Sequence, residues 1–153
     1  MLQVQTQIDI AAPASVVWAI LADFGMYRRW NPLIRGVLGH PEVGRQIEIR
    51  IRAPSGSDVG ARPTIVSIRE DREMKWLECW AMPALFASER RFQIEPLSDG
   101  IVRFHHGEQV RGIMVPLLTH RRRVRGSSGL DAMNKALKQR AERAWADRAP
   151  STH

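Results

Sequence analysis

The stretch from Met74 to Gly112 constrains the fold more than any other part of the chain. It contains three short runs that are rich in aromatic and β-branched residues, at 74–82, 85–95 and 101–112. Turn formers separate the runs, with Pro83 in the first gap and Gly100 in the second. Runs of this length and composition between turn residues predict three antiparallel strands in a meander.

Alternation along these runs divides them into an inward and an outward set, because successive side chains of a strand point to opposite faces. The outward set, which includes Lys75, Arg91 and Gln109, is mostly polar and is expected to meet water. The inward set is mostly apolar but also contains ionisable residues. Its members are Trp76, Glu78, Trp80, Met82, Phe86, Ser88, Arg90, Phe92, Ile94, Val102, Phe104, His106, Glu108 and Val110.

Tight turns at both gaps predict the register of the meander. Glu78 is expected opposite Arg90, Trp76 opposite Phe92, and Arg90 opposite Glu108 on the other side. The three charged residues would then form a row on the apolar face. A buried charge has to be paired, so the row is either a structural ion-pair network or a polar anchor for a bound ligand. Both interpretations stay open at this point.

Composition limits the class of protein. The chain has 153 residues, of which 44% are hydrophobic and 25% charged, as in an ordinary soluble domain. No signal-like segment or long apolar run is present, so we expect a cytoplasmic protein without a transmembrane segment. Five tryptophans favour an apolar ligand pocket. The single cysteine, Cys79, excludes an internal disulfide and a cysteine-cluster metal site.

The net charge of +7 is partly local, because the run from His120 to Arg125 contains four arginines. Such a run is typical of a solvated helix face, and it can also mark contact with RNA, another protein or an anionic membrane. Nucleic acid is not favoured, since no nucleic-acid motif and no interleaved aromatic residues accompany the run. Peripheral membrane contact stays open.

The remaining elements follow from periodicity. Residues 4–10 alternate as a strand, 14–22 and 26–30 form two short helices, and further strands are expected at 33–39, 47–51 and 63–70. Residues 53–60 are expected to form a flexible loop. A 3.6-residue repeat of apolar side chains then predicts a long terminal helix with a kink at 126–129. Its stripe is Leu130, Met133, Leu137, Ala141 and Ala144.

This order of elements predicts an α+β fold in which a seven-stranded, curved antiparallel sheet wraps around the long C-terminal helix. Two short helices lie between the first and second strands. The helix has to cover the apolar face of the sheet, and a twisted sheet cannot touch a helix everywhere, so a gap between them is the candidate binding site. We expect one domain over residues 1–148 and a frayed tail at 149–153.

The chain contains the segments Ile10-Ala-Ala-Pro13, Trp30-Asn-Pro32, His106-Gly-Glu108 and Met133–Lys138. In this order they resemble the SRPBCC superfamily, and most closely its bacterial polyketide cyclase/dehydrase-like or START-like group. The resemblance implies a helix-grip fold with a deep apolar cavity between the sheet and the C-terminal helix. The cavity walls that it implies are Trp30, Trp76, Trp80, Phe86, Phe92, Phe104, Met114, Leu117 and Met133.

Three functional hypotheses are compatible with these residues. The favoured one is a non-catalytic carrier or binding protein for a lipid, isoprenoid or aromatic polyketide, in which Glu78, Arg90, Glu108 and His106 orient the polar end of the ligand. The second is a cyclase or dehydrase that uses His106 and Glu108 for acid–base chemistry. The third is a partner-binding module that uses the basic helix face.

No cofactor or metal is expected under any of these hypotheses. His105 and His106 point to opposite faces of one strand, and the other histidines are scattered along the chain. Phosphate-binding and hydrolase motifs are also missing from the sequence. The oligomeric state, monomer or homodimer, is left open.

Overall fold

The computed structural model describes residues 2–53, 55–80, 84–113 and 128–148, with only the main chain at Trp80. The chain begins with strand β1 (Leu2–Ile10), helix α1 (Ala14–Ala22), the 3₁₀ helix η1 (Phe24–Met26) and helix α2 (Tyr27–Trp30). Seven strands and a helix follow. They are β2 (Ile34–Leu38), β3 (Glu48–Arg52), β4 (Asp58–Ala61), β5 (Thr64–Arg69), β6 (Glu73–Trp80), β7 (Phe86–Ser98), β8 (Ile101–Arg111) and α4 (Ser128–Arg148).

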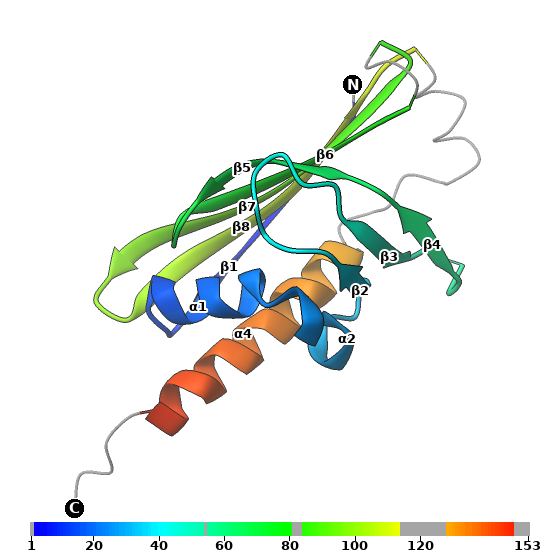
Figure 1. Cartoon of the computed structure of the whole chain (residues 1–153). Coiled ribbons are helices and arrows are strands. Elements are labelled where there is room, and N and C mark those ends of the chain that lie inside the picture. Colours follow the sequence, from blue (N-terminus) through cyan, green and yellow to red (C-terminus); the bar gives the residue numbers. More distant parts are fainter. Residues whose placement is uncertain (1, 54, 81–83, 114–127, 149–153) are drawn as a thin grey trace, which may run out of the picture.

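The strands form two antiparallel sheets. The larger sheet has the order β1-β8-β7-β6-β5, and the smaller one has the order β2-β3-β4. An isolated bridge pairs Gln46, just before β3, with Thr64 at the start of β5. Helices α1 and α4 lie against one face of the larger sheet, while the paired ends of β6, β7 and β8 extend beyond the helices (Figure 1). The α+β, helix-grip architecture predicted from the sequence is therefore confirmed.

The predicted number of strands is wrong, because the described residues form eight strands and the prediction had seven. The additional strand, β4, lies partly inside the segment 53–60 that was predicted to be a loop. Its sequence, Asp-Val-Gly-Ala, contains a glycine and only one β-branched residue, so it carries little strand signal of its own. Pairing with β3, where Arg50 lies opposite Gly60, stabilises it as a strand.

The predicted register between β6 and β7 is wrong by two residues. Trp76, rather than Glu78, lies opposite Arg90, and Glu78 lies opposite Ser88. Pairing continues to Trp80 and Phe86, closer to the turn than the sequence suggested. A shift of two residues leaves every side chain on the same face, so the hydrophobic pattern could not distinguish the two registers. The predicted pairing of Arg90 with Glu108 across β7 and β8 is confirmed.

The core lies between the larger sheet and the helices. The predicted inward residues Trp76, Phe92 and Phe104 are buried, and so is the predicted stripe of α4 at Leu130, Met133, Leu137 and Ala141. No helix in the described part of the chain is long and apolar enough to cross a membrane. The basic run 120–125 lies outside the described residues, as do positions 126–127 of the expected kink.

Candidate functional site

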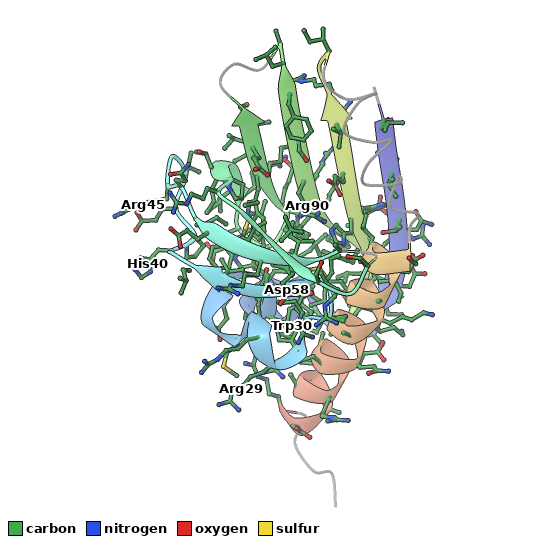
Figure 2. All side chains as sticks on the ribbon, turned by 90° about the vertical axis from the view of Figure 1, so that its right-hand side faces the viewer. Arg29, Trp30, His40, Arg45, Asp58 and Arg90 are labelled. Carbon is green, nitrogen blue, oxygen red and sulfur yellow. The ribbon has the colours of Figure 1, made fainter. Side chains whose placement is uncertain are left out.

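Arg90 is the centre of a polar cluster on the inner face of the sheet. It lies on the central strand β7 and is only 5% exposed. Its Nη1 donates to Nε2 of His106 at 2.8 Å, and its Nη2 donates to Oε2 of Glu108 at 3.2 Å. Figure 2 shows Arg90 in the interior, whereas Arg29, His40 and Arg45 lie at the periphery. A guanidinium in the core is therefore held by an imidazole and a carboxylate of the neighbouring strand.

His106 connects Arg90 to the C-terminal helix and to β1. Since Nε2 accepts from the guanidinium, Nδ1 carries the ring proton and donates to Oδ1 of Asn134 at 3.2 Å. The Nδ2 of Asn134 donates to Thr6 Oγ1 at 2.8 Å, and Thr6 Oγ1 donates to the carbonyl oxygen of His106 at 2.9 Å. The hydrogen bonds thus form a closed relay over three elements.

The electrostatics of this relay keep His106 neutral. Its ring is fully buried, and burial lowers its pKa well below the usual 6.5. The charge of the Arg90 guanidinium lowers the pKa further, while the hydrogen bond with Asn134 acts in the opposite direction and is the smallest contribution. The hydrogen bonds require a neutral imidazole ring, and burial together with the Arg90 charge favours that same state.

Asn134 and Thr6 were not among the site residues predicted from the sequence. Asn134 stands four residues after Leu130, on the buried face of α4, and it is only 1% exposed. Thr6 stands on the apolar side of β1, between Val4 and Ile8. The available signal was the same in both cases: one polar residue within an otherwise apolar face.

Glu108 lies at the boundary between the core and a more accessible part of the inner face. Its side chain is 18% exposed, compared with 6% for Arg90, and Ser88 Oγ donates to its Oε1 at 3.3 Å. Of the predicted row, the structure thus brings Arg90 and Glu108 together. Glu78 lies on the neighbouring strand opposite Ser88 and is half-buried.

A chain of aromatic rings lies beside the polar cluster. Trp76 contacts Phe92 and Phe24 edge to face, with ring centroids 5.2 and 5.6 Å apart. Phe24 in turn contacts Tyr27, and Tyr27 contacts Trp30. The indole Nε1 atoms of Trp76 and Trp30 are buried and have no hydrogen-bond partner among the described residues. A buried donor without a partner costs about 1–3 kcal/mol, so both indoles retain unused hydrogen-bonding capacity.

Four of the nine predicted cavity-wall residues have described side chains on strands of the larger sheet, and two others lie on the helices α2 and α4. Trp30 is half-buried at the end of α2. The buried members are Trp76, Phe86, Phe92, Phe104 and Met133. Met114, Leu117 and the side chain of Trp80 lie outside what the structure describes. Among the described residues, no group of three or more His, Cys, Asp or Glu side chains could hold a metal ion.

Comparison with protein families gives a match over nearly the whole chain. The family described as "Polyketide cyclase / dehydrase and lipid transport" matches residues 1–147. The chain belongs to this family. The family joins enzymes and lipid carriers on one fold, so membership leaves the reaction or cargo of an individual member open. No curated protein sequence matches the chain.

Solved structures share the fold at low sequence identity. A START superfamily protein from Mycobacterium smegmatis is 23% identical with a TM-score of 0.68, and the match covers 93% of this chain and 98% of that protein. The Zhui aromatase/cyclase from a Streptomyces species is 16% identical with a TM-score of 0.71, and 99% of each chain is covered. The di-domain aromatase/cyclase StfQ is 14% identical, with a TM-score of 0.67, 93% of this chain covered and 51% of StfQ.

Proposed function

We propose that this family member binds an apolar small molecule, such as a lipid, isoprenoid or aromatic polyketide, between the larger sheet and α4. In this proposal the polar end of the ligand is a hydrogen-bond acceptor that meets Arg90. The observation that carries the proposal is a buried guanidinium that is fixed in position by His106 and Glu108 and lies opposite an indole with an unused N–H.

The donor capacity of Arg90 supports this role. A guanidinium has five N–H groups, and His106 and Glu108 are the acceptors that the described residues offer to it. The two bonds fix the plane of the group, so it needs little ordering when a ligand arrives, which lowers the entropic cost of binding. A carbonyl, carboxylate or phenolate oxygen is the chemistry that matches its remaining donors.

Trp76 supplies both apolar contact area and a second donor. It lies directly opposite Arg90 across the β6–β7 pair, so both side chains are on the same face of the sheet. Its ring is 1% exposed, and its Nε1–H has no acceptor among the described residues. A ligand oxygen that accepted from this N–H would remove the cost of burying it.

The geometry favours binding over acid–base catalysis by His106 and Glu108. A general base needs a lone pair that can reach the substrate, but Nε2 of His106 already accepts from Arg90. Its pKa is lowered by burial and by the Arg90 charge, which makes the ring a weaker base. Glu108 accepts from both Arg90 and Ser88. The arrangement therefore supports a positioning role for His106.

The substitution Trp76→Phe tests the proposal. It removes the unused N–H while it keeps an aromatic ring in the same place. The probe is anilinonaphthalene sulfonate, an apolar aromatic molecule with an anionic acceptor group, and the measurement is its fluorescence on titration with the full chain. We expect Trp76→Phe to weaken binding by about tenfold, or roughly 1.4 kcal/mol.

The matched control is Trp18→Phe, since Trp18 is half-buried in α1 on the other side of the core. It should leave the affinity for the dye unchanged. Thermal unfolding of both variants checks that they fold. Equal affinities of Trp76→Phe and the native chain, or a native chain that does not bind the dye at all, would contradict the proposal.

A further inference from the structure

The outer face of the larger sheet has a hollow centred on Gly107. On this face Gly107 of β8 lies between Gln5 of β1 and Arg91 of β7. Because alternate residues share a face, the rows two residues before and two residues after this one also point outward. A glycine is thus surrounded by a ring of eight side chains, and the hollow has a volume of about 490 Å³.

The fold itself does not explain a glycine at position 107. The pairing of β8 with β1 and with β7 is regular at this residue, and Gly107 is not among the glycines with a positive φ. A Cβ atom there would meet Val4 O at 3.4 Å and Gln5 Cγ at 3.5 Å, which is ordinary contact. A glycine within a strand that is neither a bulge nor a bend often marks the close approach of a ligand.

The ring around Gly107 is rich in carboxamides. Five of its eight side chains are glutamines, namely Gln3, Gln5, Gln7, Gln93 and Gln109, and the others are Glu89, Arg91 and His105. Each carboxamide has an acceptor oxygen and two N–H donors, which matches hydroxyl groups because these also donate and accept. Gln5, Gln7 and Gln93 make no side-chain hydrogen bond with another described residue.

The charges in the ring do not favour an ionic ligand. Arg91 is already paired with Glu73, at 2.7 Å between Nη2 and Oε2. Glu89 adds one negative charge, and His105 Nε2 lies 3.5 Å from Glu95 Oε1. With its cation neutralised and one carboxylate present, the hollow has no excess of positive charge that would attract a phosphate or a nucleic acid.

Position in the sheet also argues against an added strand over Gly107. β8 and β7 are interior strands with neighbours on both sides, so their main-chain groups are already paired. β1 is an edge strand of this sheet, and a peptide that paired with it would lie beside the hollow rather than over Gly107. Recognition over the hollow therefore has to come from side chains. The surface is too polar for the apolar core of a stable dimer interface. The volume lies within the roughly 300–1,000 Å³ of small-molecule sites.

We infer that the hollow over Gly107 is a second binding site, separated by the thickness of the sheet from the inner cluster, for a neutral polyhydroxylated molecule such as a saccharide. Its hydroxyl groups would bond with the ring of glutamines, and Gly107 would let the sugar ring approach the main chain. This site does not depend on what the inner face binds.

The test is an NMR titration of the ¹⁵N-labelled full chain with cellobiose and with maltose. We expect shifts confined to the Gly107 amide and the side-chain amides of the surrounding glutamines, with a dissociation constant of about 1 mM. Gly107→Leu fills the hollow and should weaken binding by at least about tenfold. The matched control is Gly60→Leu, because Gly60 also lies in a strand with open space beside it.

A second variant keeps the test decisive if Gly107→Leu does not fold. Gln5→Ala removes one member of the ring from an exposed position, and Gln139→Ala removes an exposed glutamine of α4 that lies elsewhere. Weaker binding by Gln5→Ala alone supports the site. No shifts with either sugar, or equal affinity of Gln5→Ala and Gln139→Ala, would overturn it. Shifts that depend on protein concentration without sugar would instead assign the face to a second copy of the chain.

Discussion

The two faces of the larger sheet carry the same residue types in different environments. His105 and His106 are neighbours in β8, and Arg90 and Arg91 are neighbours in β7. His106 is fully buried, whereas the side chain of His105 is 34% exposed with one contact of 3.5 Å to Glu95. Residue type alone therefore does not identify a site in this sheet. Two adjacent residues of a strand point to opposite faces, so one histidine is buried and the next is exposed to solvent.

The neighbouring residues Arg90 and Arg91 differ in the same way. The side chain of Arg90 is 6% exposed and is held by His106 and Glu108. The side chain of Arg91 is 46% exposed and pairs with Glu73, which also has Lys75 at 3.6 Å. Loss of Arg91 leaves Glu73 with Lys75 as a remaining cation. Loss of Arg90 leaves the Glu108 carboxylate without its cation and Nε2 of His106 without its donor.

The largest expected effect is therefore the difference between Arg90→Met and Arg91→Met. Breaking a buried pair on one side costs about 3–5 kcal/mol, so we expect a loss of that size in the free energy of unfolding for Arg90→Met. Arg91→Met should cost less than about 1 kcal/mol. Urea denaturation measures both, and equal losses would remove the distinction between the faces.

The next effect separates two neighbours in α4. Asn134→Leu removes the acceptor for His106 and the donor to Thr6, and it should cost about 1–3 kcal/mol of unfolding free energy because buried partners lose their bonds. Lys135→Leu changes an exposed neighbour and serves as the control. If the two variants unfold at the same urea concentration, the relay does not contribute to stability.

The pH dependence of stability provides a third comparison. The pKa of His106 is lowered in the folded chain, so between the usual value of 6.5 and the folded value the unfolded chain binds a proton that the folded chain excludes. Stability should therefore fall as the pH drops below 6.5, by up to about 1.4 kcal/mol per pH unit.

Two carboxyls set the lower limit of this window. The pKa of Glu142 is lowered, chiefly by its hydrogen bond with Lys138, and the pKa of Asp9 by its hydrogen bond with Arg103. Their contributions begin to be lost only below their usual values of 4.5 and 3.8. Thermal unfolding of His106→Gln should show a flatter profile above pH 4.5, and His105→Gln should keep the native slope. An unchanged slope in His106→Gln would contradict the assignment.

The smallest expected effect lies on the outer face. Gly107→Ala places a methyl group where it makes only ordinary contacts, and alanine loses less backbone entropy than glycine on folding. We expect a gain of about 0.5 kcal/mol in unfolding free energy, measured by urea denaturation. A loss of stability would show that the fold requires glycine at this position.

The sequence predicted which side chains face inward more reliably than which side chains meet. Alternation alone places Arg90 and His106 on the inner face, and the turn between β7 and β8 also determines that Arg90 lies opposite Glu108 and Phe92 opposite His106. Across β6 and β7 a two-residue shift keeps every side chain on the same face, so alternation does not distinguish the two registers. For this reason the predicted pairing of Glu78 with Arg90 was wrong.

The rest of the site depends on contacts between distant segments. Thr6 and Asn134 are 128 residues apart and meet through a hydrogen bond of 2.8 Å. Periodicity indicates that each lies on a buried face, but nothing local in the sequence indicates that these two polar groups find each other. The relay follows from how α4 crosses the sheet, which sequence patterns do not determine.

The state of the His106 ring is the most direct test of the account, because it separates a positioned polar anchor from an acid–base catalyst. The measurement is the ¹⁵N chemical shift of both ring nitrogens as a function of pH. The hydrogen bonds and the lowered pKa of His106 predict a neutral ring with the proton on Nδ1 that persists well below pH 6.5. A ring that becomes an imidazolium near neutral pH, or carries its proton on Nε2, would contradict the relay and favour catalysis.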